Sequence, residues 1–141
     1  REYSSCSSSI IVFRKININM QHADQWILST LYDANRNDID TYRLYLALRR
    51  YIYDNRDFVG FIEQVSPTVM RFKPVTDVAD DCFYGITMFE PHIAKRHRRR
   101  GAPSAEYYSR LGRNAFKSIG FPGIYKNWEF WIMYVKEHIV I

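Results

Sequence analysis

The hydrophobic and polar positions of residues 40–54 alternate with the period of an amphipathic helix. Leu44, Leu48 and Ile52 recur along one face, whereas Arg50 lies on the opposite face. Apolar residues at this spacing form a stripe that packs against a protein core. This is the clearest element of the chain, and the pattern predicts a helix over the whole segment.

Weaker versions of the same pattern predict three more helices, over residues 22–33, 56–65 and 104–118. The last of these has a well-marked beginning and end. Ser104 suits the N-cap position, where a hydroxyl accepts a hydrogen bond from a free backbone N–H, and Gly120 suits the end of a helix. We therefore expect helices to provide most of the regular structure.

Three segments fit a helix less well. Residues 9–20 begin with an apolar run and then alternate polar and apolar positions, which predicts a strand or an extended arm. Residues 69–75 look extended. Residues 77–89 have helically spaced apolar positions, but Gly85 weakens that prediction because glycine is a poor helix former.

The predicted fold class is therefore mainly α. We expect an extended N-terminal arm over residues 1–20 and a single, mostly helical domain over residues 21–141, since 141 residues fit one domain. The domain should contain about four to five helices and an irregular basic loop, and the extended segments leave room for a minor β component.

The final segment, residues 127–141, is apolar around most of its circumference if it is helical. A helix of this kind is buried on more than one side. In so small a domain this suggests cover by a neighbouring protein or a membrane surface. The alternative is a central element of the chain's own core. The predicted partner interface consists of Trp128, Phe130, Trp131, Met133 and Tyr134.

Positive charge is concentrated at the C-terminal end of the chain. Residues 1–92 carry 10 Lys/Arg against 12 Asp/Glu, a net charge of −2, whereas residues 93–141 carry 10 against 3, a net charge of +7. Such asymmetry indicates an anionic partner for the basic part. The tract at residues 95–100 reads Lys-Arg-His-Arg-Arg-Arg, and we expect an extended, mobile loop over residues 92–101 because like charges repel.

The helix predicted after this tract extends the basic character. Its residues Arg110, Arg113 and Lys117 are spaced so that they share one face, and with the tract they suggest one continuous basic surface. Arginine offers a planar fork that binds phosphate bidentately. The predicted ligands of a phosphate, a lipid head group or an acidic subunit are Lys95, Arg96, Arg98, Arg99, Arg100, Arg110, Arg113 and Lys117.

The sequence contains no motif that indicates catalysis. The acids and histidines between Asp80 and His97 lack the ligand spacing of zinc sites. Asp77, Asp80 and Asp81 come from one short segment, so they do not suit two-metal catalysis, and we expect them to be solvated or paired with the arginines of the basic tract. Acids before Cys82 should raise the pKa of its thiol. We expect no enzyme activity, no metal and no cofactor.

Composition adds two constraints. The aromatic fraction of 16% is high, which suits a packed core or an interface. The chain has no apolar run of roughly 18 residues, so we expect no transmembrane span of its own. Cys6 and Cys82 lie far apart and do not resemble a disulfide framework, which suggests a reducing compartment.

The N-terminal residues suggest a mitochondrial protein, or otherwise an intracellular one. The sequence starts at Arg1 without methionine, as a processed product or an excised domain does, and Tyr3 and the serines after it resemble a presequence cleavage site. Residues 4–9 suit the end of a transit peptide, although Glu2 departs from the usual acid-poor composition. The alternative is a serine-rich tail of no targeting significance.

Residues 41–50, Thr-Tyr-Arg-Leu-Tyr-Leu-Ala-Leu-Arg-Arg, resemble the first-helix motif of the mitochondrial Leu-Tyr-Arg adaptor proteins. Members of that family are accessory subunits and assembly factors of respiratory complexes, and they fold as three-helix bundles. Thr41 stands where the family has its leucine, and the likeness covers only this short segment. The resemblance implies an accessory role, but we do not assign the chain to the family from it.

Two functional hypotheses follow. The first is a non-catalytic accessory subunit of a large mitochondrial, membrane-associated assembly, such as a respiratory or ATP synthase complex, which contacts other protein subunits or anionic lipid. The second is an RNA-binding subunit of an organellar ribosome or another ribonucleoprotein, with Tyr107, Tyr108 or Trp128 stacking on bases. The acidic first two-thirds of the chain count against the second hypothesis.

Overall fold

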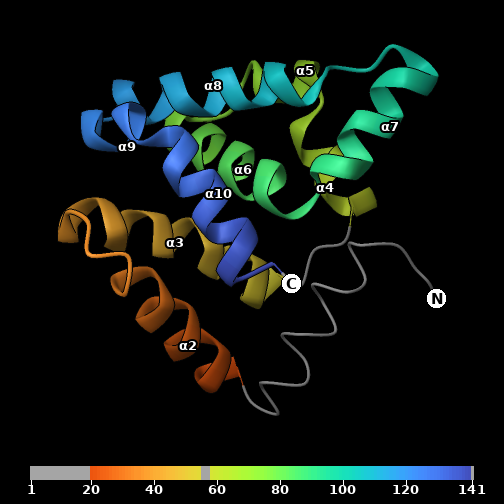
Figure 1. The fold of residues 1–141 in the computed structure, drawn as a ribbon. Coiled ribbons are helices and arrows are strands. Elements are labelled where there is room, and N and C mark those ends of the chain that lie inside the picture. The colour runs from red at the N-terminus through yellow and green to blue at the C-terminus, as the bar shows by residue number, and fades with distance from the viewer. Residues whose placement is uncertain (1–19, 55–57, 141) are drawn as a thin grey trace.

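The computed structural model describes residues 20–54 and 58–140, and every regular element in these ranges is a helix (Figure 1). The mainly α prediction is therefore confirmed, and the described part contains no β component. The predicted arm lies outside the described residues except for Met20, which begins the first helix. The helices are α2 (Met20–Tyr32), α3 (Asp38–Asp54), α4 (Phe58–Val65), α5 (Pro67–Met70), α6 (Val75–Met88), α7 (Glu90–Arg100), α8 (Ala105–Ser118), α9 (Pro122–Lys126) and α10 (Trp128–His138).

The helices predicted from apolar spacing correspond to α2, α3, α4 and α8. The described residues contain nine helices in all, because α6, α7 and α10 and the short helices α5 and α9 add to these four, so the expected four to five helices are roughly consistent with the structure. Residues 69–75, predicted to be extended, instead contain the end of α5, a turn and the first residue of α6. The three-helix bundle implied by the Leu-Tyr-Arg resemblance is not the arrangement seen.

The predicted basic loop is the main correction, because these residues form helix α7. Pro91 occupies the first turn, where proline is tolerated, and Gly101 ends the helix at φ 67°. The basic residues of the last turn interact favourably with the negative end of the helix dipole. Ile93 is buried against the domain. Capping, the dipole and this packing together outweigh the repulsion between like charges.

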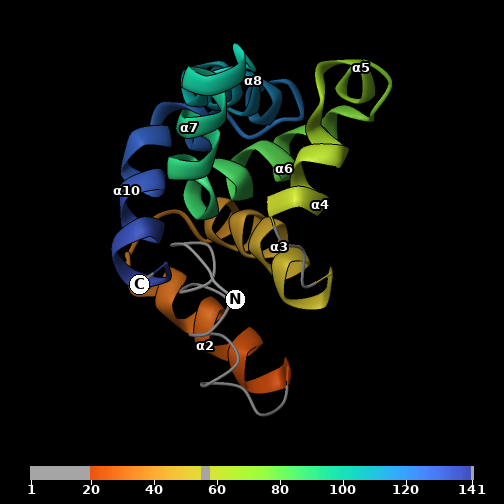
Figure 2. The same ribbon diagram turned by 90° about the vertical axis from the view of Figure 1, so that its right-hand side faces the viewer.

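Helix α6 runs through the centre of the domain and packs against α3, α4, α8 and α10 (Figures 1 and 2). It contributes ten buried residues, and these include the polar side chains of Asp81 and Thr87. Gly112 allows α8 to approach it closely, since a Cβ at that position would lie 2.6 Å from Cys82 Cβ. Among the described helices none is both long and apolar enough to cross a membrane.

Candidate anion-binding helix

Helix α7 carries five Lys or Arg side chains in its last two turns. Lys95, Arg98, Arg99 and Arg100 are exposed and Arg96 is half-buried. At roughly 100° per residue, these positions cover about 200° of the helix circumference. None of the five forms an ion pair within the described part of the chain. The helix therefore presents a concentrated positive charge that the domain itself does not neutralise.

One side of α7 borders a hollow of about 210 Å³, which we call the α7 crevice. Phe58, at the start of α4, and His92 form the aromatic part of its lining, with their ring centroids 5.1 Å apart. None of its lining residues is acidic. The cations that border it are Lys95, Arg96, Arg99 and Arg100. A crevice of this size and charge suits one small anionic group, because arginine and lysine both donate strong hydrogen bonds to phosphate.

His92 lines this crevice in its neutral form near pH 7. Burial lowers the pKa of its imidazole, and the nearby Lys95 lowers it further. The other charged side chains lining the crevice, Arg96, Arg99 and Arg100, are also positive. The imidazole is therefore a group whose protonation would add to the positive charge of the crevice at lower pH.

The same shift makes the stability of the fold depend on pH. An unfolded chain restores the His92 pKa to about 6.5, so the unfolded state binds this proton more tightly than the folded state does. The His92 contribution to the free energy of unfolding is therefore expected to fall as pH drops from about 6.5 through the lower folded-state pKa. Urea titrations at a series of pH values should show a shallower dependence for His92→Gln than for the wild type. A His92→Gln profile parallel to the wild type between pH 7 and pH 5 would contradict this expectation.

The predicted basic residues of α8 lie on a different helix from the cations of α7. Only residues 101–104 separate the two helices, so α8 begins near the end of α7, but it then runs away for about 21 Å (Figure 1). Lys117 lies in its last turn. The predicted ligands are thus divided between α7 and the middle and end of α8.

All three of the predicted α8 cations interact within the domain. Arg113 Nε donates a hydrogen bond to the backbone oxygen of Tyr125 at 2.9 Å, and its guanidinium lies 4.4 Å from the Tyr125 ring centroid. Lys117 Nζ lies 4.7 Å from the same centroid. Arg110 is exposed and lies 3.6 Å from Glu106. Arg113 and Lys117 thus help to hold α9 against α8, so α7 is the stronger candidate for an external anion.

The predicted aromatic interface lies largely inside the domain. Trp128 and Trp131 are 2% and 0% exposed, so neither side chain is available to a partner in this structure. Phe130 and Tyr134 are half-buried, and the Tyr134 hydroxyl donates to the Thr30 backbone oxygen at 2.7 Å. Met133, at 55% exposed, is the one predicted interface residue on the surface. The structure therefore favours the alternative, in which α10 completes the chain's own core.

The adjacent acids of α6 have partners other than those predicted. Asp80 Oδ1 lies 2.5 Å from Arg43 Nη1, and burial raises the pKa of Asp80 although Arg43 and Arg50 act in the opposite direction. Asp81 is fully buried, with Lys73 Nζ at 2.6 Å and Arg50 Nη1 at 3.2 Å. These acids bind cations of α3 and of the turn before α6. They leave the arginines of α7 without the intramolecular partners that the sequence suggested.

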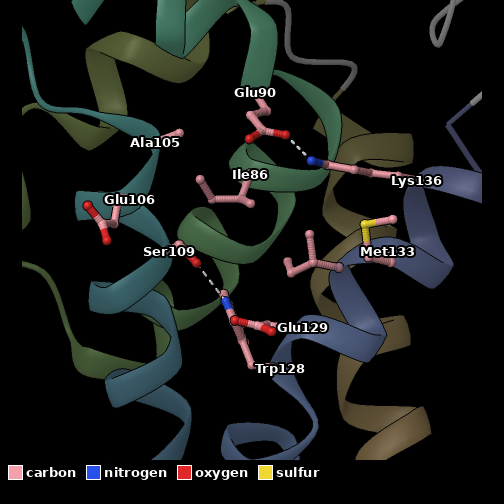
Figure 3. A pocket seen from close by; sticks show the side chains of 10 residues that line it. Ile86, Glu90, Ala105, Glu106, Ser109, Trp128, Glu129, Met133 and Lys136 are labelled. Carbon is pink, nitrogen blue, oxygen red and sulfur yellow. Dashed lines mark hydrogen bonds and ion pairs between the residues drawn. The ribbon is translucent and has the colours of Figure 1, made fainter.

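A second hollow, of about 450 Å³, lies between α8 and α10 and has an acidic rim (Figure 3). Glu90, Glu106 and Glu129 surround an apolar floor that includes Ile86. Glu90 forms an ion pair with Lys136 across the hollow (Figure 3). Because Glu90 begins α7 and Lys136 lies in the last turn of α10, this pair ties the two helices together. None of the acids that surround this hollow lines the α7 crevice.

Two candidate catalytic features can be checked in the described residues, a metal cluster and a nucleophilic thiol. No cluster of three or more His, Cys, Asp or Glu suited to a metal ion occurs there. Cys82 is fully buried, and this burial, together with Asp81, raises the pKa of its thiol. A thiol held in this way is a poor nucleophile.

The α7 crevice was not predicted, because the basic tract was expected to form a loop and not a helix. His92, Arg96 and Arg99 are spaced three to four residues apart, which places them on one side of a helix. That spacing was the available signal. The contribution of Phe58 depends on the packing of α4 beside α7, which the sequence does not reveal. No family model, curated protein or solved structure matches the chain, so the candidate site rests on the chain's own residues and geometry.

Proposed function

We propose that this chain is a non-catalytic docking subunit that binds an anionic partner within a larger assembly through helix α7. One observation carries the proposal: the five cations of α7 have no acidic partner in the described structure. Like charges gathered on one helix repel each other, and a polyanion would relieve that repulsion. Each cation close to an anionic surface contributes about 1 kcal/mol to binding.

The proposal assigns docking to α7 rather than to the aromatic C-terminal segment. Trp128 and Trp131 stabilise the domain from within, whereas the cations of α7 point to a partner. We include a mitochondrial location in the proposal because of the serine-rich composition of residues 4–9. Anionic lipid, acidic subunits and RNA are the classes of partner to compare.

The test compares two triple variants of the full chain that lose equal charge. One variant carries Arg98→Gln, Arg99→Gln and Arg100→Gln in α7. The control carries Arg110→Gln, Lys117→Gln and Lys126→Gln, all exposed positions outside α7. Binding to a 20-nucleotide single-stranded RNA, to poly-glutamate and to phosphatidylserine vesicles is measured at low salt, and circular dichroism checks that each variant is folded.

At least one of these polyanions should bind the wild type. The α7 variant should then lose roughly tenfold or more in affinity, and the control variant should lose clearly less, because a helix of concentrated charge contributes more than scattered cations do. Absence of binding to all three probes would contradict the proposal. Equal losses in the two variants would also contradict it, since net charge alone would then account for binding.

A further inference from the structure

Building on this proposed function, we propose that the anionic partner is a single-stranded nucleic acid. One of its phosphates sits in the α7 crevice, and a neighbouring base stacks on Tyr107. The inference depends on the docking role of α7 and goes beyond it by naming the class of partner and two subsites. It rests on the crevice, on another hollow that lies between α5 and α8 and includes Tyr107, and on the chemistry of the side chains that line both.

The α7 crevice has the properties of a subsite for one phosphate. Its volume of about 210 Å³ is smaller than the roughly 300–1,000 Å³ of whole-ligand pockets, so it fits part of a longer molecule. Three of the four cations around it are arginines, which bind phosphate bidentately. Because no acid lines the crevice, nothing there opposes the entry of an anion.

The other hollow, which we call the Tyr107 hollow and which differs from the acidic one between α8 and α10, lies between α5 and α8 and has a volume of about 510 Å³. Its lining includes Tyr107, which is 40% exposed, together with Asn114, Arg71 and several apolar residues such as Met70 and Leu111. An exposed aromatic ring stacks on any base, and an amide can hydrogen-bond to a base edge. No carboxylate lines this hollow either.

The two hollows lie on connected parts of the domain. Burial raises the pKa of Tyr108, and Arg96, which borders the α7 crevice, lies near enough to act in the opposite direction. The Tyr108 ring packs edge-on against the Tyr107 ring, with centroids 5.2 Å apart. A strand bound at Arg96 therefore has an aromatic platform nearby. Tyr108 itself is 3% exposed and cannot take that role, so the predicted stacking set reduces to Tyr107.

A membrane surface fits these observations less well. Helices that lie on a membrane combine cations on one face with large apolar side chains on the other, which enter the bilayer. The apolar side chain of that kind in α7 is Ile93, and it is buried within the domain. The cations of α7 also extend over about 200° of the helix, more than a flat surface contacts at once. A flexible strand can follow such a curved array.

The acidic first two-thirds of the chain is not an obstacle to this inference. Local charge at the binding surface matters more than the net charge of the whole chain, because salt screens charges more than about 10 Å apart. The α7 crevice and the Tyr107 hollow are lined by cations, aromatic rings, polar groups and apolar side chains, and neither lining contains an acid.

The experiment measures binding of a fluorescently labelled 20-nucleotide single-stranded RNA to the full chain over a range of salt. The crevice variant carries Arg96→Gln and Arg99→Gln. The matched control carries Arg98→Gln and Arg110→Gln, which remove the same charge outside the crevice lining. Tyr107→Ala tests stacking, and Tyr107→Phe keeps the ring. Single-stranded DNA, duplex RNA, poly-glutamate and phosphatidylserine vesicles are the comparison probes.

The crevice variant should bind the single strand at least roughly tenfold more weakly, and the slope of log affinity against log salt should become shallower by about 0.7, because one phosphate is no longer neutralised. The control pair should lose clearly less. Tyr107→Ala should lose roughly fivefold or more, as expected for a lost base stack, while Tyr107→Phe should retain affinity. Duplex RNA should bind more weakly than the single strand.

The outcomes separate this inference from the proposed function. If α7-dependent binding occurs with vesicles or poly-glutamate but not with the single strands, the partner class is wrong and the docking role stands. If no probe depends on α7, both are wrong. Equal losses in the crevice and control pairs would overturn the phosphate subsite, and wild-type binding by Tyr107→Ala would overturn the stacking subsite. A chemical denaturation curve for each variant shows whether a loss reflects unfolding instead.

Discussion

Replacement of Asp81 by alanine should lower the free energy of unfolding by about 3–5 kcal/mol, the usual effect of removing one partner of a buried ion pair. The Asp81 side chain is fully buried and lies 2.6 Å from Lys73 and 3.2 Å from Arg50. Without it, Lys73 loses its carboxylate partner and Arg50 is left with Asp80 at 3.7 Å, while both cations stay largely removed from water. Urea denaturation of the wild type and the variant at pH 7 gives the difference directly.

The matched control is Glu106→Ala, which removes a carboxylate from an exposed pair with Arg110. Exposed pairs contribute little, so this variant should stay within about 1 kcal/mol of the wild type. Asp81→Asn keeps the shape of the side chain and removes its charge, and we expect it to be destabilised as well. An Asp81→Ala variant as stable as Glu106→Ala would show that the ion network contributes nothing net to the fold.

The ion network shows which part of the fold could not be predicted from sequence. Asp80 and Asp81 follow each other in a helix whose existence was itself uncertain, and their partners come from α3 and from the turn before α6. Local pattern predicts that α3 is amphipathic, but it does not say which helix receives Arg43 and Arg50. Pairing of distant helices is set by packing across the whole core.

Gly85 illustrates the same limit within α6. As a poor helix former it made the helix prediction ambiguous. In the structure a Cβ at this position would lie 2.0 Å from the Phe61 ring, so glycine is the residue that lets α4 pack against α6. The intrinsic cost of glycine is about 1 kcal/mol, and burial of a phenylalanine side chain contributes roughly 1.5–3 kcal/mol. Tertiary packing therefore outweighs local preference here.

The candidate site was predicted in part. Sequence alone picked out the basic residues of α7, because their density needs no knowledge of the fold. It misplaced them in a loop, since the charge repulsion was weighed without the cap at Gly101 or the buried Ile93. It also joined them to Arg113, whose hydrogen bond to the Tyr125 backbone depends on the position of α9. Composition thus identified the chemistry of the site, and packing decided its extent.

The role of the C-terminal helix is open to a decisive test with Trp131→Ala. If α10 belongs to the chain's own core, this substitution should lower the free energy of unfolding of the isolated chain by about 3–5 kcal/mol, as large-to-small changes at buried tryptophans do. Trp131 is 0% exposed and packs beside Phe130 and Tyr134, with ring centroids 5.4 and 6.1 Å away.

Met133→Ala is the control on the same helix, because Met133 is 55% exposed and should cost no more than about 0.5 kcal/mol. If this segment were instead a partner interface, Trp131 and Met133 would contact another protein and not the chain's own core. Both substitutions would then be nearly neutral for the stability of the isolated chain. Chemical denaturation of the two variants therefore separates the two roles. A large gap between them assigns the aromatic segment to the core and leaves α7 as the surface that docks. Equal, small effects would return the aromatic segment to the interface, because a tryptophan that supports the core cannot be removed without loss.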